Sequence, residues 1–342
     1  MIRLEQVRHR WGAFELDASL HVAGGEYFVI LGPSGAGKSL LLKTILGAYR
    51  PRAGRVLIDG DDVTAAGPQR RRVGMVFQNY LLFDHLSVRA NIDYGRRYAR
   101  TPLPADALDR LIELLGLAPL MDRRPATLSR GEQQRVALAR AMAIQPRVLC
   151  LDEPLGPLDQ NVQVALRQEL LAFHRAFGVT TLHVTHDHHE ALTLADRIGV
   201  MFDGRIVQVG SGDDVFYRPA DARLARFVMT ENVLAVRAEV GAVWLGPTRL
   251  DAPGVGITGP AMLCVRPELL ERVRAPGANV LSARVQAVGR DGHLVTAKLA
   301  AAAGTGDWGL SIRGTRRELG ELSLDAKVLV RVPPEAIHCF SA

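Results

Sequence analysis

The first two-thirds of the chain alternate short apolar runs with amphipathic segments, which is the pattern of βαβ units. Most of the apolar runs suit parallel strands that are buried on both faces. The predicted strands are Tyr27–Leu31, Val148–Leu151 and Thr181–Thr185. Farther along, Ile198–Phe202 and Arg205–Val209 flank Asp203-Gly204, which predicts a hairpin with a two-residue turn. From residue 87 to about 140 the spacing becomes helical, so we expect an α/β core with a helical insert.

The pattern changes after Glu231, where short β-like segments follow one another between glycines and prolines. These segments are Val233–Val240, Met262–Val265, Ala283–Val288, Leu294–Leu299 and Lys327–Val332. Many short strands separated by turn residues are typical of a small β-barrel. We therefore predict two domains, an α/β domain over residues 1–231 and an all-β, OB-like barrel over residues 232–342.

Composition narrows the class of protein. Hydrophobic residues make up 48% of the 342 and charged residues 23%, as in ordinary globular proteins. No apolar run approaches the roughly 20 residues that span a bilayer, and the start lacks the features of a signal peptide. We expect a cytosolic protein whose membrane role comes through a partner.

The three cysteines show no CxxC spacing, which argues against a disulfide framework or a zinc site. The net charge is +6, but the arginines are scattered, which disfavours nucleic acid as a partner.

A phosphate-binding loop follows the first apolar strand. The residues Gly32-Pro33-Ser34-Gly35-Ala36-Gly37-Lys38-Ser39 fit G-x-x-x-x-G-K-[ST] at every fixed position and open the helical run Lys38–Leu46. Glycines let the backbone curl its N–H groups towards phosphate oxygens, and the helix N-terminus adds partial positive charge. We predict that Lys38 contacts the β- and γ-phosphates of ATP and that Ser39 ligates Mg²⁺. The motif stands complete and in its strand–helix context, so a chance glycine-rich turn is not favoured.

Two acids end a second apolar strand, Val148–Leu151. A P-loop enzyme needs one carboxylate at a strand end to hold Mg²⁺, and Asp152 fits that place. Glu153 then lies where it can polarise the attacking water. The alternative is that both acids cap the next helix. Together with the complete phosphate loop, the acids favour nucleotide hydrolysis.

The stretch Leu128-Ser129-Arg130-Gly131-Glu132-Gln133 resembles the LSGGQ signature of ABC ATPases. The resemblance implies that Ser129, Gly131 and Glu132 contact the γ-phosphate of ATP bound to a second copy of the chain, so that a homodimer completes each site. Arg130 replaces a glycine of the signature and Glu132 its glutamine, which leaves the hydrolysis rate open.

Other elements of the ABC family occur in the family's order. Gln78 resembles the Q-loop glutamine, which contacts Mg²⁺ and water, and Asp159 resembles the D-loop aspartate at the dimer interface. His186 resembles the switch histidine at the γ-phosphate, and Trp11 occupies the place of the aromatic residue that stacks on adenine. A metal site built from His186 and its neighbouring histidines is disfavoured, since no cysteine or second carboxylate cluster completes it.

The last third resembles the TOBE, or molybdate-binding-like, domain of import ATPases. Val265-Arg266-Pro267-Glu268 is similar to a recurrent element of that domain, and Ser311–Leu319 is similar to its molybdate-binding repeat. Hydroxyls and arginines at Ser311, Arg313, Thr315 and Arg316 can bind an oxyanion. The alternative is a solvated basic loop.

The resemblance implies an ATP-hydrolysing subunit of an ABC importer, with ATP and Mg²⁺ as cofactors, at the cytoplasmic face of the inner (plasma) membrane. The expected partners are two integral-membrane permease subunits and, through them, an extracytoplasmic substrate-binding protein. Molybdate or tungstate is the expected cargo, and sulfate, iron, polyamine and sugar are alternatives. An alternative of another class is a soluble ABC ATPase of DNA repair or translation. A third is a regulatory oxyanion binder that uses the barrel alone, and the complete motor motifs argue against it.

Overall fold

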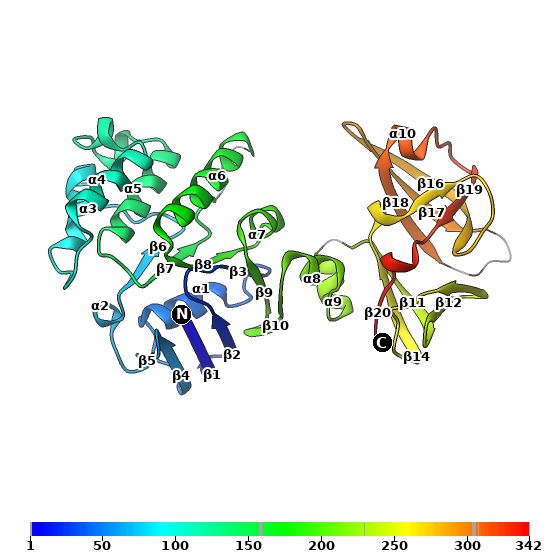
Figure 1. The fold of residues 1–342 in the computed structure, drawn as a ribbon, viewed down its shortest axis with the longest axis horizontal. Helices are drawn as coiled ribbons and strands as arrows, with labels where there is room; N and C mark the ends of the chain where they lie inside the picture. Colours follow the sequence, from blue (N-terminus) through cyan, green and yellow to red (C-terminus); the bar gives the residue numbers. More distant parts are fainter. Residues whose placement is uncertain (1, 157–159, 229, 303–305, 307, 342) are drawn as a thin grey trace. The chain divides into compact units, whose positions relative to one another are not determined.

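The computed structural model describes residues 2–156, 160–228, 230–302, 306 and 308–341. The chain divides into two compact units, residues 1–212 and 213–342 (Figure 1). This division differs from the boundary at residue 231 that the sequence suggests. Helices α8 (Gly212–Tyr217) and α9 (Ala222–Phe227) group with the second unit, because α9 packs against strands of that unit.

The first unit is built on a ten-stranded sheet with the order β5-β4-β1-β2-β10-β9-β3-β8-β7-β6. Its strands are β1 (Ile2–Trp11), β2 (Phe14–Val22), β3 (Tyr27–Leu31), β4 (Ala53–Ile58), β5 (Asp61–Asp62), β6 (Val73–Val76), β7 (Val148–Asp152), β8 (Thr180–Thr185), β9 (Arg197–Phe202) and β10 (Arg205–Gly210). The neighbours from β9 to β6 pair in parallel, and their side chains are almost all buried. The predicted α/β core and the β9–β10 hairpin are confirmed.

Helices lie against this sheet and in a separate group beside it (Figure 1). Those nearer the sheet are α1 (Lys38–Leu46), α2 (Pro68–Arg71), α6 (Gln160–Phe177) and α7 (His188–Leu194). The group beside the sheet holds α3 (Val88–Arg96), α4 (Ala105–Leu114), the short turns η1 (Ala118–Leu120) and η2 (Pro125–Thr127), and α5 (Arg130–Met142), which also packs against β6. Ser87 caps α3, since its side chain accepts a hydrogen bond from the Ala90 N–H. Among the described residues, no helix combines the length and the apolar character needed to cross a bilayer.

The second unit contains two five-stranded antiparallel sheets, ordered β13-β12-β11-β14-β20 and β15-β19-β16-β17-β18. Its strands are β11 (Asn232–Glu239), β12 (Ala242–Leu245), β13 (Thr248–Asp251), β14 (Gly259–Val265), β15 (Glu271–Val273), β16 (Val280–Asp291), β17 (Leu294–Ala301), β18 (Gly309–Thr315), β19 (Lys327–Arg331) and β20 (His338–Ser341). Short helices join them, namely η3 (Pro267–Leu269), α10 (Arg316–Leu319) and η4 (Pro334–Ala336). The predicted all-β domain is therefore present, in the form of two sheets.

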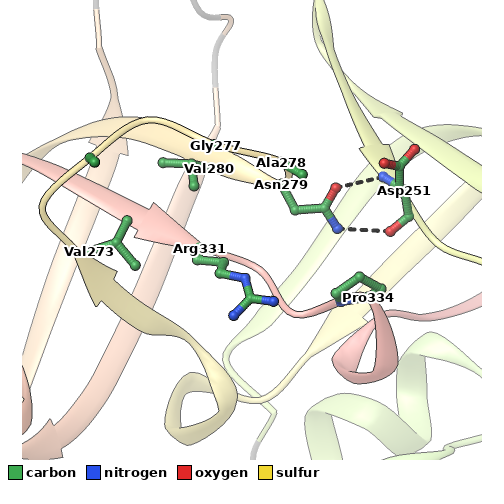
Figure 2. Close-up of a pocket in the computed structure, with 9 residues that line it drawn as sticks. Asp251, Val273, Gly277, Ala278, Asn279, Val280, Arg331 and Pro334 are labelled. Carbon is green, nitrogen blue, oxygen red and sulfur yellow. Dashed lines mark hydrogen bonds between the residues drawn. The ribbon is translucent and has the colours of Figure 1, made fainter.

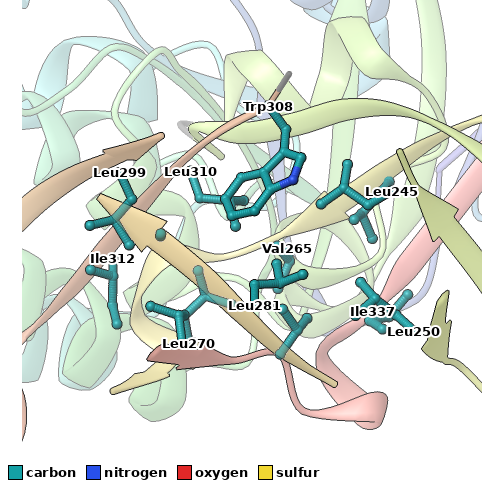
Figure 3. Close-up of a cluster of buried hydrophobic side chains, with 14 of the residues drawn as sticks. Leu245, Leu250, Val265, Leu270, Leu281, Leu299, Trp308, Leu310, Ile312 and Ile337 are labelled. Atoms are coloured by element: carbon teal, nitrogen blue, oxygen red, sulfur yellow. The ribbon is translucent and has the colours of Figure 1, made fainter. Parts of the chain in front are cut away.

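Asn279 fastens the two sheets of the second unit together. Its side chain accepts a hydrogen bond from the Asp251 N–H and donates one to the Asp251 carbonyl (Figure 2). It also donates to the carbonyl of Val332. The two sheets also share one apolar core, in which Trp308 and leucines of both sheets pack together (Figure 3). Burial of these side chains is the main force that holds such a small β domain together.

Candidate functional site

The predicted phosphate loop connects β3 to α1, as the motif requires. Two of its glycines are required by the local geometry. A Cβ on Gly32 would lie 2.3 Å from the Met201 carbonyl oxygen. Gly37 has φ +100°, in the left-handed region, and a Cβ there would lie 2.6 Å from the ring of Phe14. The loop therefore lies close to β9 on one side and to β2 on the other. These close approaches restrict the conformation of its backbone.

Lys38 starts helix α1 and is almost completely buried, at 5% exposure. Its ammonium group donates hydrogen bonds to the carbonyls of Gly32 (2.7 Å) and Pro33 (3.0 Å). Burial lowers the pKa of Lys38, and the nearby carboxylates of Glu153 and Asp152 oppose that shift. A desolvated cation held at the mouth of the loop is suited to a phosphate group.

Ser39 and Asp152 form the pair expected for Mg²⁺. The Ser39 hydroxyl donates a hydrogen bond of 2.8 Å to the Asp152 carboxylate at the end of β7. Burial raises the pKa of Asp152, and the Ser39 hydroxyl opposes that shift. A hydroxyl and a buried carboxylate next to a phosphate loop supply the hard oxygen ligands that Mg²⁺ prefers. These residues therefore fit the ion.

Glu153 lies at the centre of the site. Its carboxylate accepts a hydrogen bond from the Gln78 amide (3.2 Å) and lies 3.1 Å from His186 Nδ1 and 3.8 Å from Lys38 Nζ. Its backbone has φ +45°, in the left-handed region, and its N–H donates to the Val184 carbonyl. Three residues that the sequence singled out separately thus converge on one carboxylate, from the turn after β8, from α1 and from the loop after β6. The arrangement can orient a water molecule and accept its proton.

Trp11 stands at the end of β1, and its strand partner is Phe14, whose ring packs beside Gly37. The Trp11 ring lies edge-on to Tyr49, with ring centroids 5.4 Å apart, and against His9 at 3.9 Å. Trp11 thus belongs to a small aromatic cluster, and its strand partner Phe14 lies beside the phosphate loop; stacking on adenine stays a prediction.

The signature residues form a second group. Ser129 caps α5, and its hydroxyl accepts a hydrogen bond from the Glu132 N–H. The Glu132 carboxylate accepts a 2.7 Å hydrogen bond from the Ser129 N–H, which lowers the pKa of Glu132. Glu132 therefore completes a capping box. Helix α5 packs against α3 and β6, whereas α1 packs against β7 and β8, so the two groups belong to different parts of the unit.

The sequence also singles out Asp159 and the histidines near His186. Asp159 lies outside the described residues. Among the neighbouring histidines, His183 is fully buried and bonds to the Tyr27 hydroxyl (3.0 Å), and it lies 3.1 Å from Glu190. His183 and His186 thus have different partners, and no group of three or more His, Cys, Asp or Glu residues in the described ranges is arranged to hold a metal.

The expected oxyanion residues of the second unit have partners within the chain. Ser311 is buried, and its backbone is bonded to the side chain of Asn232. Arg313 pairs with Glu231, Arg316 pairs with Glu321, and Thr315 caps α10. The structure therefore does not bring these hydroxyls and guanidinium groups together as one open anion site within the chain.

Tyr80 is a residue that the sequence reasoning missed. Its side chain is buried, and its hydroxyl donates a hydrogen bond of 3.3 Å to the carbonyl of Pro154, the residue after Glu153. The only sequence signal is its place two residues after Gln78.

Comparisons with known proteins identify the family of the chain. The sequence profile of the ABC transporter family matches residues 16–156. The chain is 38% identical to the molybdate/tungstate import ATP-binding protein of Pyrococcus horikoshii, over 99% of this chain and 100% of the relative. It is 43% identical to the sulfate/thiosulfate import ATP-binding protein of Mesorhizobium japonicum, over 79% of this chain and 81% of the relative.

Solved structures show the same likeness for the first unit. One is a dimeric ATP-binding cassette in a post-hydrolysis state bound to ADP and phosphate, with a TM-score of 0.54 at 28% identity over 62% of this chain and 99% of the other. Another is a nucleotide-free cassette from an ABC transporter, with a TM-score of 0.59 at 25% identity over 68% and 99% of the two chains.

Fold and site together define a P-loop ATPase, which confirms the expected α/β nucleotide-binding class. The chain belongs to the ABC transporter family, as an ATP-binding subunit of the import type.

Proposed function

We propose that this ATPase drives the import of molybdate or tungstate. The observation that carries the cargo assignment is the likeness to the Pyrococcus horikoshii protein, which extends over the whole length of both chains. Sulfate is the second candidate cargo. The sulfate/thiosulfate relative has the higher sequence identity, but the likeness covers a smaller part of the chain. The motor residues do not contact the cargo in any of these assignments.

The hydrolytic roles follow from the site's contacts. Glu153 orients the attacking water and accepts its proton, while Gln78 and His186 hold the carboxylate in place. Lys38 exchanges its bonds to loop carbonyls for bonds to the β- and γ-phosphates. Mg²⁺, held by Ser39 and Asp152 with help from Gln78, would neutralise phosphate charge in the transition state.

A second copy of the chain completes each site in this proposal. Ser129 and Gly131 begin helix α5, whose N-terminal dipole favours an anion, and they would contact the partner's γ-phosphate. The capping box formed by Glu132 keeps that helix start rigid, and it also directs the Glu132 carboxylate to its own backbone. Glu132 thus supports the nucleotide contact through the helix end. Phosphate contacts made only in the closed dimer would supply the energy for closure.

The remaining partners follow from the import class. Closure of the dimer would push on two integral-membrane permease subunits, which receive the cargo from an extracytoplasmic binding protein. The chain would then lie peripherally on the cytoplasmic face of the inner membrane. A soluble, non-transport ABC ATPase stays the less favoured alternative, since the relatives named above are import proteins.

A transport assay distinguishes the candidate cargoes. Cells that lack their own molybdate and sulfate importers receive the chain together with a permease and a binding protein of the molybdate/tungstate import class, and their tungsten, molybdenum and sulfur contents are measured by mass spectrometry. We expect uptake of tungstate or molybdate that a tenfold excess of sulfate does not suppress. A Glu153→Gln variant of the chain serves as the matched control without hydrolysis. Uptake of sulfate alone would refute the cargo assignment and leave the ATPase assignment intact.

A further inference from the structure

The loop that carries Gln78 contains two consecutive residues in an unfavourable backbone conformation. Tyr80 has φ +57° and Leu81 has φ +46°, and both are bulky side chains in the left-handed region. Such conformations persist only where the surrounding structure holds them. The turn therefore needs a restraint close to its own backbone.

Arg140, on helix α5, supplies that restraint. Its two terminal nitrogens donate hydrogen bonds to the carbonyls of Leu81 (2.6 Å) and Tyr80 (2.7 Å), the two residues with positive φ. The guanidinium group also lies 5.5 Å from the centre of the Phe83 ring. A planar fork can hold two adjacent carbonyls at once, which a lysine ammonium does less well.

The turn held by Arg140 is connected to Glu153, the proposed general base, and to the next residue through two hydrogen bonds. The Tyr80 hydroxyl bonds to the Pro154 carbonyl, and the Gln78 amide bonds to Glu153 itself. Leu81, by contrast, is 56% exposed, so the turn is buried on one side and open on the other. Helix α5 carries Arg140 in its last turn and is capped at its start by Ser129. One side chain thus links the signature helix to the segment that contacts Glu153.

We propose that Arg140 is a positioning residue for hydrolysis. By holding the Tyr80–Leu81 turn it places Gln78 against Glu153, and it ties any movement of helix α5 to that contact. This inference rests on the proposed role of Gln78. Without the guanidinium group, the turn relaxes towards ordinary φ values and Gln78 leaves the carboxylate, while the phosphate loop keeps its own contacts.

ATPase kinetics of the purified full-length chain test the inference. Arg140→Ala should lower kcat on the order of 10- to 100-fold, the effect expected of misplacing a catalytic group by about 1 Å, with little change in KM for ATP. Arg140→Lys, which keeps a cation near the turn, should recover part of kcat. Arg135→Ala is the matched control, because Arg135 lies on the same helix but pairs with Glu169 and not with the Tyr80–Leu81 turn, and kcat should stay near wild type.

A double-mutant cycle separates positioning from general destabilisation. If Arg140 acts through Gln78, then Arg140→Ala should add almost nothing to the loss already caused by Gln78→Ala. Hydrogen exchange of the amides in residues 79–84 should rise in Arg140→Ala and not in Arg135→Ala. Losses that multiply in the double variant, or unchanged exchange in this segment, would overturn the inference. Full activity of Gln78→Ala would instead refute the role of Gln78, and the exchange measurement would still decide whether Arg140 holds the turn.

Discussion

Replacing the Glu153 carboxylate with a neutral group should separate ATP binding from ATP hydrolysis more clearly than any other change in the site. Glu153→Gln keeps the shape of the side chain and can still bond to Gln78 and His186. It removes the group that accepts the proton of the attacking water. It also removes a negative charge 3.8 Å from the ammonium of Lys38, which is free to bind phosphate once that attraction is lost.

Glu153→Gln should affect the two steps differently: it lowers the rate of hydrolysis but does not weaken ATP binding. Loss of a general base lowers turnover by about 10²- to 10⁴-fold, or about 3–5 kcal/mol in the barrier. A charge pair at about 4 Å near a protein surface attracts by roughly 4 kcal/mol before solvation is counted, so its removal does not weaken ATP binding. We therefore expect ATP affinity equal to or tighter than wild type and an ATP-stabilised dimer.

Three measurements check this expectation. Phosphate release gives kcat, calorimetry gives ATP affinity, and size-exclusion chromatography gives the oligomeric state with ATP and Mg²⁺. Glu169→Gln is the matched control, since it is the same substitution at a partly exposed carboxylate that pairs with Arg135 on α5. Wild-type turnover of Glu153→Gln would remove Glu153 from the catalytic role. Weaker ATP binding would refute the argument from the distance to Lys38.

Other substitutions test the remaining parts of the site. Lys38→Ala should weaken ATP binding itself, because a buried cation at the loop is lost, and unchanged affinity by calorimetry would sink the phosphate-loop assignment. Ser129→Arg should block ATP-driven dimerisation in sedimentation experiments without preventing ATP binding to the monomer, and a monomer that cannot bind ATP would contradict the cross-subunit role. Burial raises the pKa of Asp152, so its ionised form destabilises the fold as pH rises through the folded-state pKa. Without ATP and Mg²⁺, Asp152→Asn should therefore melt above wild type at pH 7 while losing hydrolysis, and an equal or lower melting temperature would show that this reasoning is wrong.

Much of the first unit could be predicted from sequence because its elements carry strong local signals. The bounds of α1 agree with the predicted run Lys38–Leu46, since glycines precede and follow the apolar positions. The buried strands β3 and β7 are predicted for a similar reason, as short apolar runs, whereas β8 is buried although it contains threonines and a histidine. The antiparallel strands β1, β2 and β4 mix buried with exposed positions, which gives a weaker signal than a fully buried run, and their pairing depends on contacts between distant segments.

The site residues came mainly from motif order, and their contacts could not be predicted in the same way. The sequence placed Gln78, Glu153 and His186 in one site, but their convergence on a single carboxylate depends on the sheet order β8-β7-β6. The resemblance to the family signature predicts a contact of Glu132 with ATP, whereas in the structure its carboxylate closes the capping box with Ser129. The two-sheet form of the second unit depends on long-range bonds such as those of Asn279, which no local pattern records.

The left-handed backbone of Glu153 has a consequence for engineering this protein. A non-glycine residue in that region costs on the order of 1–2 kcal/mol, so the chain keeps the carboxylate that we propose as the general base at the expense of thermal stability. A selection for heat resistance alone would favour glycine at position 153, because glycine adopts that conformation freely. Such a selection would yield a more heat-resistant protein without ATPase activity. Directed evolution of this chain therefore needs an activity screen at every round.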